Sequence, residues 1–169
     1  AAVGGTGFAK VGGNYAGGMR ATRKALENGC KEVLWLDAHE HKYVEEVGTS
    51  NAFFMIGGEV ITAPLGGSIL PGVTRDSTIT LLRKWGYTVS ERRLSIQDIE
   101  AASKDGSLQE AWATGTACVI SPIGYLRYMD RDIVIHGGGV GPVSQKLYDH
   151  IYGMQTGVVA DDMGWIVQL

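Results

Sequence analysis

The chain has 169 residues, 44% of them hydrophobic and 20% charged, and a formal net charge of −3. This composition is typical of one globular domain with a hydrophobic core, and it excludes a fibrous or repetitive protein. Because no cluster of lysine and arginine occurs and no apolar run approaches the roughly 20 residues of a membrane helix, we expect neither nucleic acid nor a membrane as partner.

The cysteines and the first residue add context. Cys30 and Cys118 can form at most one disulfide, and no signal peptide is visible, so a reduced, cytoplasmic setting is expected. The sequence starts at Ala1 rather than at methionine, only nine residues before Lys10. We therefore interpret it as a C-terminal piece of a longer protein.

The first segment, residues 4–15, is rich in glycine and isolates Lys10, with Tyr15 five positions further on. Glycine lets the backbone approach a bulky ligand closely, and a lysine in a tight pocket can act as a nucleophile and form a Schiff base. A nucleotide-binding P-loop is not indicated, because Val11 occupies the position that requires Ser or Thr. A turn with a solvated lysine is the plain alternative for this segment.

An amphipathic helix is predicted over residues 16–28, where apolar and small side chains recur near helical spacing and Gly29 suits the position after the helix. Four short apolar strands follow, separated by polar or glycine turns: residues 32–36, 43–47, 52–56 and 59–62. The last two flank Gly57-Gly58, which predicts a hairpin.

A second helix is predicted after Pro71-Gly72 and ends at Gly86. Thr74 suits its N-cap or first turn, and Asp76 suits its positive end. The remaining predicted elements are strands over 87–92, 109–113, 119–126 and 132–135 and helices over 96–103 and 142–152. The last helix has Pro142 at its first position.

Short strands and helices joined by both hairpins and βα steps favour one particular fold class. We predict a single α/β or α+β domain over residues 1–169, with a mixed, barrel-like sheet surrounded by helices.

Two turns in this domain are suited to a phosphate. The helix start at Val73-Thr74 presents unpaired N–H groups, positive dipole and a hydroxyl, and the turn Gly115-Thr116-Ala117 exposes amides beside a second hydroxyl. Ordinary capping or turn formation is the alternative for each turn taken singly. Together with Lys10 they favour a phosphorylated cofactor.

Glu46 adds an acid to this set. A carboxylate beside a pyridine nitrogen keeps that nitrogen protonated, so that the ring withdraws electrons. Glu45 points to the opposite face of the strand, so only one of the two can serve; a solvated carboxylate is the alternative. His39 and His41 are interpreted as solvated loop residues, and no metal site is expected.

Five segments now stand in order: 5–15, 29–36, 46–51, 70–75 and 115–118. They resemble the branched-chain amino acid aminotransferases, which are pyridoxal-phosphate enzymes of fold type IV, and the resemblance covers essentially the whole chain. It implies that Lys10 forms the Schiff base with pyridoxal 5'-phosphate and shuttles the proton between the substrate Cα and the cofactor C4′. It also implies that Tyr15 pairs with the phenolic oxygen, that Glu46 pairs with the pyridine nitrogen, and that Leu70 packs against the ring.

The same resemblance implies how the phosphate and the substrate are held. The amides of Val73 and Thr74 and the Thr74 hydroxyl bind the phosphate, with Thr116 on its other side. The amides of Thr116 and Ala117 lie near the substrate carboxylate.

The activity implied is transfer of the amino group of leucine, isoleucine or valine to 2-oxoglutarate, by a protein that is usually a homodimer. A D-amino acid aminotransferase, an aminodeoxychorismate lyase, and a fragment that is inactive without its N-terminal half are the alternatives. The family's N-terminal domain, which supplies an arginine to the phosphate, is absent from this sequence. Some members carry a Cys-x-x-Cys redox switch, but Ser121 replaces the second cysteine after Cys118, so no such switch is expected.

Overall fold

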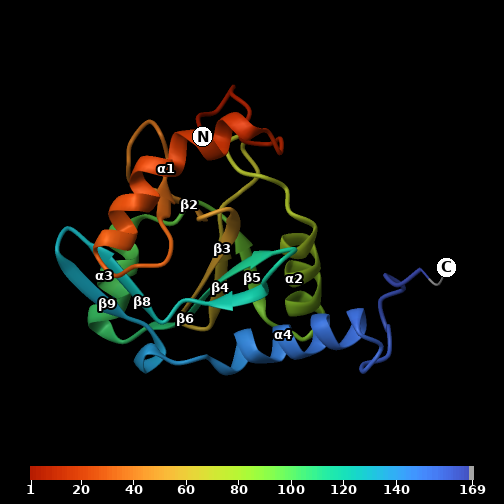
Figure 1. Ribbon diagram of the computed structural model, residues 1–169. Helices are drawn as coiled ribbons and strands as arrows, with labels where there is room; N and C mark the ends of the chain where they lie inside the picture. The colour runs from red at the N-terminus through yellow and green to blue at the C-terminus, as the bar shows by residue number, and fades with distance from the viewer. Residues whose placement is uncertain (168–169) are drawn as a thin grey trace.

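The computed structural model describes residues 1–167. Figure 1 shows a central curved sheet with helices on both sides, the N-terminus beside α1 and the C-terminal segment extending beyond α4. The helices are α1 (Gly12–Glu27), α2 (Val73–Lys84), α3 (Ile96–Asp105) and α4 (Pro142–Gln155), with a short 3₁₀ turn, η1 (His136–Gly138). The strands are β1 (Leu34–Leu36), β2 (Val44–Val47), β3 (Ser50–Ile56), β4 (Glu59–Thr62), β5 (Thr88–Glu91), β6 (Leu108–Gly115), β7 (Val119–Pro122), β8 (Tyr125–Tyr128) and β9 (Arg131–Val134).

The sheet is built around β3, which pairs antiparallel with three strands. One edge of β3 carries β6 along residues 51–56. The other edge carries β2 at residues 50–51 and β4 at residues 53–56, so the sheet forks between these two contacts. Only β4 and β5 pair in parallel. The mixed, barrel-like sheet expected from the sequence is therefore present, as is the hairpin at Gly57-Gly58.

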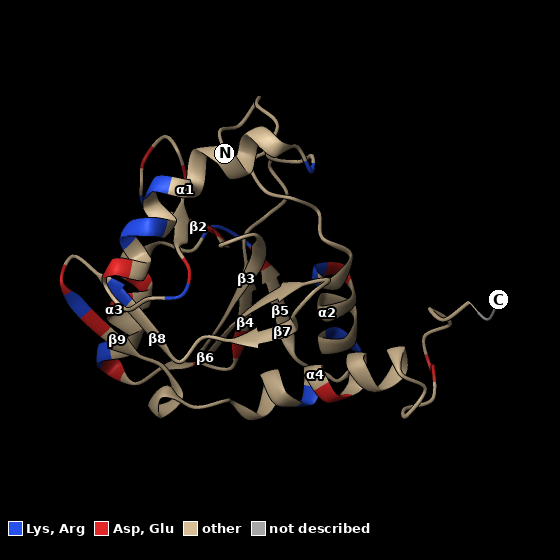
Figure 2. Ribbon diagram, viewed as in Figure 1, with Lys and Arg blue, Asp and Glu red and all other residues tan. Residues whose placement is uncertain are grey.

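Side-chain alternation along β3 divides the interior into two cores. Ala52 and Phe54 face a cluster that includes Ile96 and Ile99 of α3, whereas Phe53 stacks on Trp112 in a second cluster with α2 and α4. Successive side chains of a strand point to opposite faces, so one strand supplies both cores. Charged residues lie mainly on the outer helices, loops and the β8–β9 hairpin (Figure 2).

Helix α1 differs from the prediction in two respects. It begins at Gly12, four residues ahead of the expected start, and so includes Tyr15. None of its residues is buried, and Met19 and Leu26 are 71% and 59% exposed. The helical spacing was identified correctly, but the apolar side chains that it aligns do not enter a core.

The predicted strand over 119–126 is wrong as a single element. Pro122 ends β7, which pairs with β6, and Tyr125 begins β8, which pairs only with β9. Between them Gly124 passes so close to the backbone of Gly138 that a Cβ would lie 2.5 Å from its carbonyl oxygen. A proline and a glycine thus divide one apolar run between two sheets.

No helix among residues 1–167 is both long enough and apolar enough to cross a membrane.

Candidate active site

The acid predicted at Glu46 lies at the fork of the sheet. Its Oε1 accepts the backbone N–H of Leu70 and the side-chain amide of Asn51, each at 3.2 Å. Burial raises the pKa of Glu46 above its ordinary value, and the hydrogen bond from Leu70 opposes this rise only in part. Oε2 accepts no hydrogen bond from any described residue. One carboxylate oxygen is therefore anchored and the other is left for a ligand.

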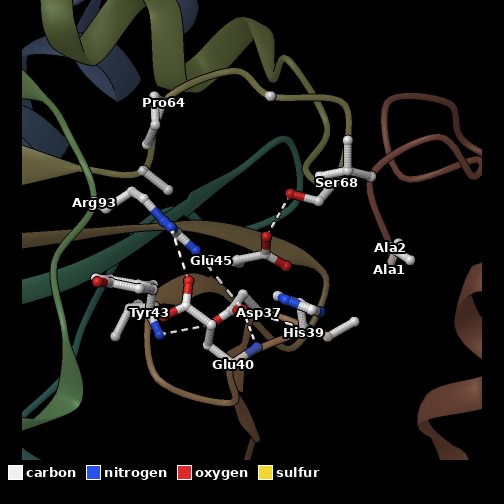
Figure 3. Close-up of a pocket in the computed structure, with 15 residues that line it drawn as sticks. Ala1, Ala2, Asp37, His39, Glu40, Tyr43, Glu45, Pro64, Ser68 and Arg93 are labelled. Carbon is white, nitrogen blue, oxygen red and sulfur yellow. Dashed lines mark hydrogen bonds and ion pairs between the residues drawn. The ribbon is translucent and has the colours of Figure 1, made fainter.

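Glu45 lies in a separate hollow of about 640 Å³, shown in Figure 3. Ser68 donates its hydroxyl hydrogen to Glu45. The prediction that the two neighbouring glutamates face opposite sides of β2 is confirmed, because Glu46 reaches Leu70 and Glu45 reaches Ser68. Both contacts are made to the β4–α2 loop, residues 63–72, so the pair of carboxylates holds that loop at two points.

The other charges of this hollow are matched within it. Arg93 lies 3.7 Å from the centre of the Tyr43 ring and pairs with Glu40 at 3.1 Å and with Asp37 at 3.8 Å (Figure 3). Burial works to raise the pKa of Asp37, but four backbone N–H donors within residues 39–43 outweigh it and hold that pKa well below its usual range. This cluster stabilises the turn before β2 rather than offering a free charge.

The β4–α2 loop leads directly into the predicted phosphate seat. Gly72 is the N-cap of α2, and no side chain caps this helix. Val73 is 82% exposed, and Thr74 falls in the first turn rather than at the cap. The amides of Val73 and Thr74 donate to no acceptor within the described part of the chain. An uncapped helix start with free N–H groups is suited to an anion.

The other predicted turn, Thr116-Ala117, joins β6 to β7 and is exposed. Val119 follows it with φ of 57°, which is uncommon for a β-branched residue. Thr116 and Ala117 line a cleft of about 1200 Å³ that Lys10 also lines. Both free thiols, Cys30 and Cys118, face this cleft.

Lys10 is exposed, and its amine makes no hydrogen bond or ion pair with any residue between 1 and 167. Its loop is held by Asn14, whose side-chain amide donates to the carbonyl oxygens of Thr6 and Ala9, both at 2.9 Å. Gly7 packs so closely on Ser68 that a Cβ would lie 2.3 Å from the Ser68 carbonyl oxygen. The lysine loop therefore rests on the β4–α2 loop.

The structure thus assembles the predicted residues into two neighbouring groups. Glu46 and Leu70 lie together beside the start of α2, and Lys10 shares a cleft with the Thr116-Ala117 turn. The groups are joined through the sheet, since Glu46 pairs with Asn51 in β3 and Asn51 pairs with Thr114 in β6. Tyr15 stands apart on α1, where it is 42% exposed and makes no hydrogen bond to the described residues.

Asn14 and Asn51 were quoted only as parts of motifs, and their supporting roles were missed. Each side chain bonds to carbonyl oxygens of another segment. No local spacing signals such a contact, because the partner of Asn51 lies 19 residues away in the sequence.

The fold and the site together define an aminotransferase of fold type IV. The chain belongs to the family described as amino-transferase class IV, whose sequence pattern matches residues 9–125. The resemblance and the fold class predicted from the sequence are confirmed.

Curated relatives are more specific. The chain is 52% identical over 169 residues to branched-chain-amino-acid aminotransferase 2 of Bacillus subtilis (strain 168), covering 100% of this chain and 47% of that protein. It is also 52% identical over 166 residues to a probable branched-chain-amino-acid aminotransferase of Staphylococcus epidermidis, covering 98% of this chain and 46% of that protein. The chain spans about half the length of the curated relatives it matches.

Solved structures agree with these relatives. A branched-chain amino acid aminotransferase of Escherichia coli matches 99% of this chain and 53% of its own, with a TM-score of 0.84 and 31% identity. Another branched-chain amino acid aminotransferase, solved in complex with N-(5'-phosphopyridoxyl)-L-glutamate and given the source abbreviation T.th., matches 95% of this chain and 50% of its own, with a TM-score of 0.78 and 32% identity.

Proposed function

We propose that this chain is the cofactor-binding part of a branched-chain amino acid aminotransferase that uses pyridoxal 5'-phosphate. Leucine, isoleucine or valine would donate the amino group, and 2-oxoglutarate would accept it. One observation carries the proposal: the β4–α2 loop joins the half-anchored carboxylate of Glu46 to the uncapped start of α2. An acid and a phosphate seat at the two ends of one short loop suit the two ends of a phosphorylated pyridine.

The residues present fit this cofactor. The free Oε2 of Glu46 would hold the proton of the pyridine nitrogen, and Leu70, bound to Glu46 through its amide, would lie against the ring. The amides of Val73 and Thr74 and the Thr74 hydroxyl would hold the phosphate, with Thr116 on the other side. Tyr15 would donate to the phenolic oxygen. When bound, the cofactor supplies a carbonyl that takes up the amino group and a ring that withdraws electrons from the adjacent carbon.

The remaining work falls to Lys10 and the turn after β6. The unpaired Lys10 amine would move the proton between Cα of the amino donor and C4′ of the cofactor. The exposed amides of Thr116 and Ala117 would bind the donor carboxylate, since backbone N–H groups in a turn bind anions. Removing Lys10 should therefore remove both the covalent link and the proton carrier.

The proposal also includes a cytoplasmic homodimer and an N-terminal domain that completes the phosphate site. Relatives about twice as long as this chain support the second point. Light scattering on the intact protein tests the first, because a monomer with full activity would contradict the dimer.

The direct test is spectroscopic. The intact protein, mixed with pyridoxal 5'-phosphate, should develop a visible absorbance band that Lys10→Ala abolishes, and turnover of L-leucine should fall by a factor of about 10²–10⁴. Lys24→Ala is the matched control, because Lys24 lines the same cleft from α1. An unchanged band in Lys10→Ala would refute the assignment.

A comparison of amino donors tests the substrate class. L-Leucine should be the preferred donor over D-alanine. Preference for D-alanine, or conversion of aminodeoxychorismate, would instead assign the chain to another fold type IV activity.

A further inference from the structure

Asn51 occupies the point where three parts of the proposed site meet. Its side chain is 3% exposed and belongs to β3, the central strand of the sheet. Its Nδ2 donates to Oε1 of Glu46 at 3.2 Å and to the carbonyl oxygen of Leu70 at 2.8 Å. One buried amide therefore joins the acid in β2 to the loop that leads to α2.

The other end of the same amide meets the helix start. A Cβ placed on Gly72 would lie 2.3 Å from Oδ1 of Asn51. Gly72 has φ of −68° and ψ of 138°, a conformation that any residue adopts. Glycine is needed here for space rather than for backbone freedom. Asn51 and Gly72 thus fit against each other at the N-cap of α2.

We infer that Asn51 is the positioning residue of the cofactor site, which sets the place of the Glu46 carboxylate relative to Leu70 and to the start of α2. The inference rests on the proposed function, because it assigns Asn51 a role toward the proposed cofactor. Without its N–H donors, Glu46 would keep only the Leu70 amide, and the Leu70 carbonyl oxygen would lose its partner on Asn51. A buried polar group without its partner is costly, so the loop would shift and carry Leu70 and the helix start with it.

The test uses the intact protein, titrated with pyridoxal 5'-phosphate and without amino acid. Asn51→Asp keeps the size of the side chain and Oδ1 but replaces both N–H donors with a carboxylate oxygen. We expect cofactor affinity to fall about tenfold or more. We also expect the pH midpoint of the visible band to move by about one unit, because Glu46 no longer holds the ring proton in place.

Thr62→Val is the matched control. Thr62 is 2% exposed and donates to the carbonyl oxygen of Ala52 at 2.7 Å, one residue from Asn51 on the same strand. The control loses a buried hydrogen bond in the same sheet without touching Glu46 or the β4–α2 loop. It should lower thermal stability while leaving the pH midpoint of the band unchanged.

A double-mutant cycle tests the contact from the other side. Gly72→Ala should weaken cofactor binding in the presence of Asn51, because the new Cβ pushes on Oδ1. In the Asn51→Ala background the same change should weaken binding at least about threefold less, since the obstructing oxygen is gone. The cycle also serves if Asn51→Asp fails to fold.

Each outcome decides between the proposals. A shifted midpoint in Asn51→Asp with an unshifted Thr62→Val, or a non-additive cycle, supports the positioning role. A normal band with an unshifted midpoint in Asn51→Asp and an additive cycle overturns it and leaves the proposed function standing. No visible band in the unchanged protein refutes the proposed function and the positioning role together, whereas a band without L-leucine turnover refutes only the substrate.

Discussion

Glu45 and Glu46 are adjacent in β2 and carry the same side chain, yet their surroundings differ. Glu46 shares its buried row with Asn51 and Thr114 across the sheet, whereas Glu45 enters the hollow of Figure 3 and accepts a hydrogen bond from Ser68. The alternation of a strand predicts the difference in direction. It does not predict which of the two faces carries the partly buried acid with a free oxygen.

Glu46→Gln should stabilise the chain in the absence of cofactor. Burial raises the pKa of Glu46 in the folded state, so the folded chain binds this proton more tightly than the unfolded chain does. Stability from this group is therefore present at low pH and is lost as the pH rises through the folded pKa. A neutral Gln keeps an Oε1 acceptor for Leu70 and Asn51 and avoids that loss.

Thermal unfolding of the cofactor-free protein checks this prediction. The midpoint of Glu46→Gln should exceed that of the unchanged protein at pH 7, and the gain should disappear below about pH 4, where both states bind the proton. With cofactor present the order should reverse, because the charge that holds the ring proton is gone. A Gln variant less stable at pH 7 without cofactor would contradict the account.

At the scale of elements, α4 begins on a carboxylate from another strand. Glu110 of β6 is 4% exposed and accepts the amides of Val143 at 2.9 Å and Ser144 at 3.0 Å, together with the Ser144 hydroxyl at 3.1 Å. The N-cap is Gly141, where a Cβ would lie 2.1 Å from the Glu110 carboxylate. The glutamate thus takes the space and the role of a capping side chain.

Glu110→Ala should lower the free energy of unfolding by about 2–3 kcal/mol, because two buried amides lose their acceptor. Urea denaturation measures the loss. Glu110→Gln should cost less, since one of its two oxygens remains an acceptor. A loss below about 0.5 kcal/mol for the alanine variant would show that water replaces the carboxylate at no cost.

Among the elements themselves, sequence patterns predicted most strands and helices and missed specific boundaries. The Gly-Gly hairpin and the Pro142 start were predicted correctly because turn and cap residues act on their immediate neighbours. The run 119–126 was predicted as one strand, because apolar composition cannot show that its halves pair with different partners. Helix α1 starts early, across Gly12 and Gly13, where glycine propensity predicts loop.

For the molecule as a whole, the two cores lie on the two faces of β3 and account for α2, α3 and α4, whereas α1 contributes no buried residue. An isolated helix of this length gains little stability from its own hydrogen bonds. Local stability should therefore be highest in the forked sheet and lowest along α1 and the lysine loop.

Hydrogen–deuterium exchange of the chain should show this order. We expect amides of α1 to exchange at least ~10²-fold faster than those of β3. Helix α3 is the matched control, since it is also short but buries Ile96 and Ile99 and begins with a capping box at Ser95. Equal protection of α1 and α3 would contradict the prediction and would mean that another surface covers α1.

The sequence by itself determined the class of protein and the chemistry of its site. Lys10, Glu46 and the turns at Val73-Thr74 and Thr116-Ala117 could be named because each depends on residue type and on neighbours within a few positions. The tertiary structure decided that Leu70 bonds to Glu46, 24 residues away, and that Glu110 caps a helix beginning 32 residues later. Such contacts depend on which strands pair and in what register, and local periodicity carries no record of either.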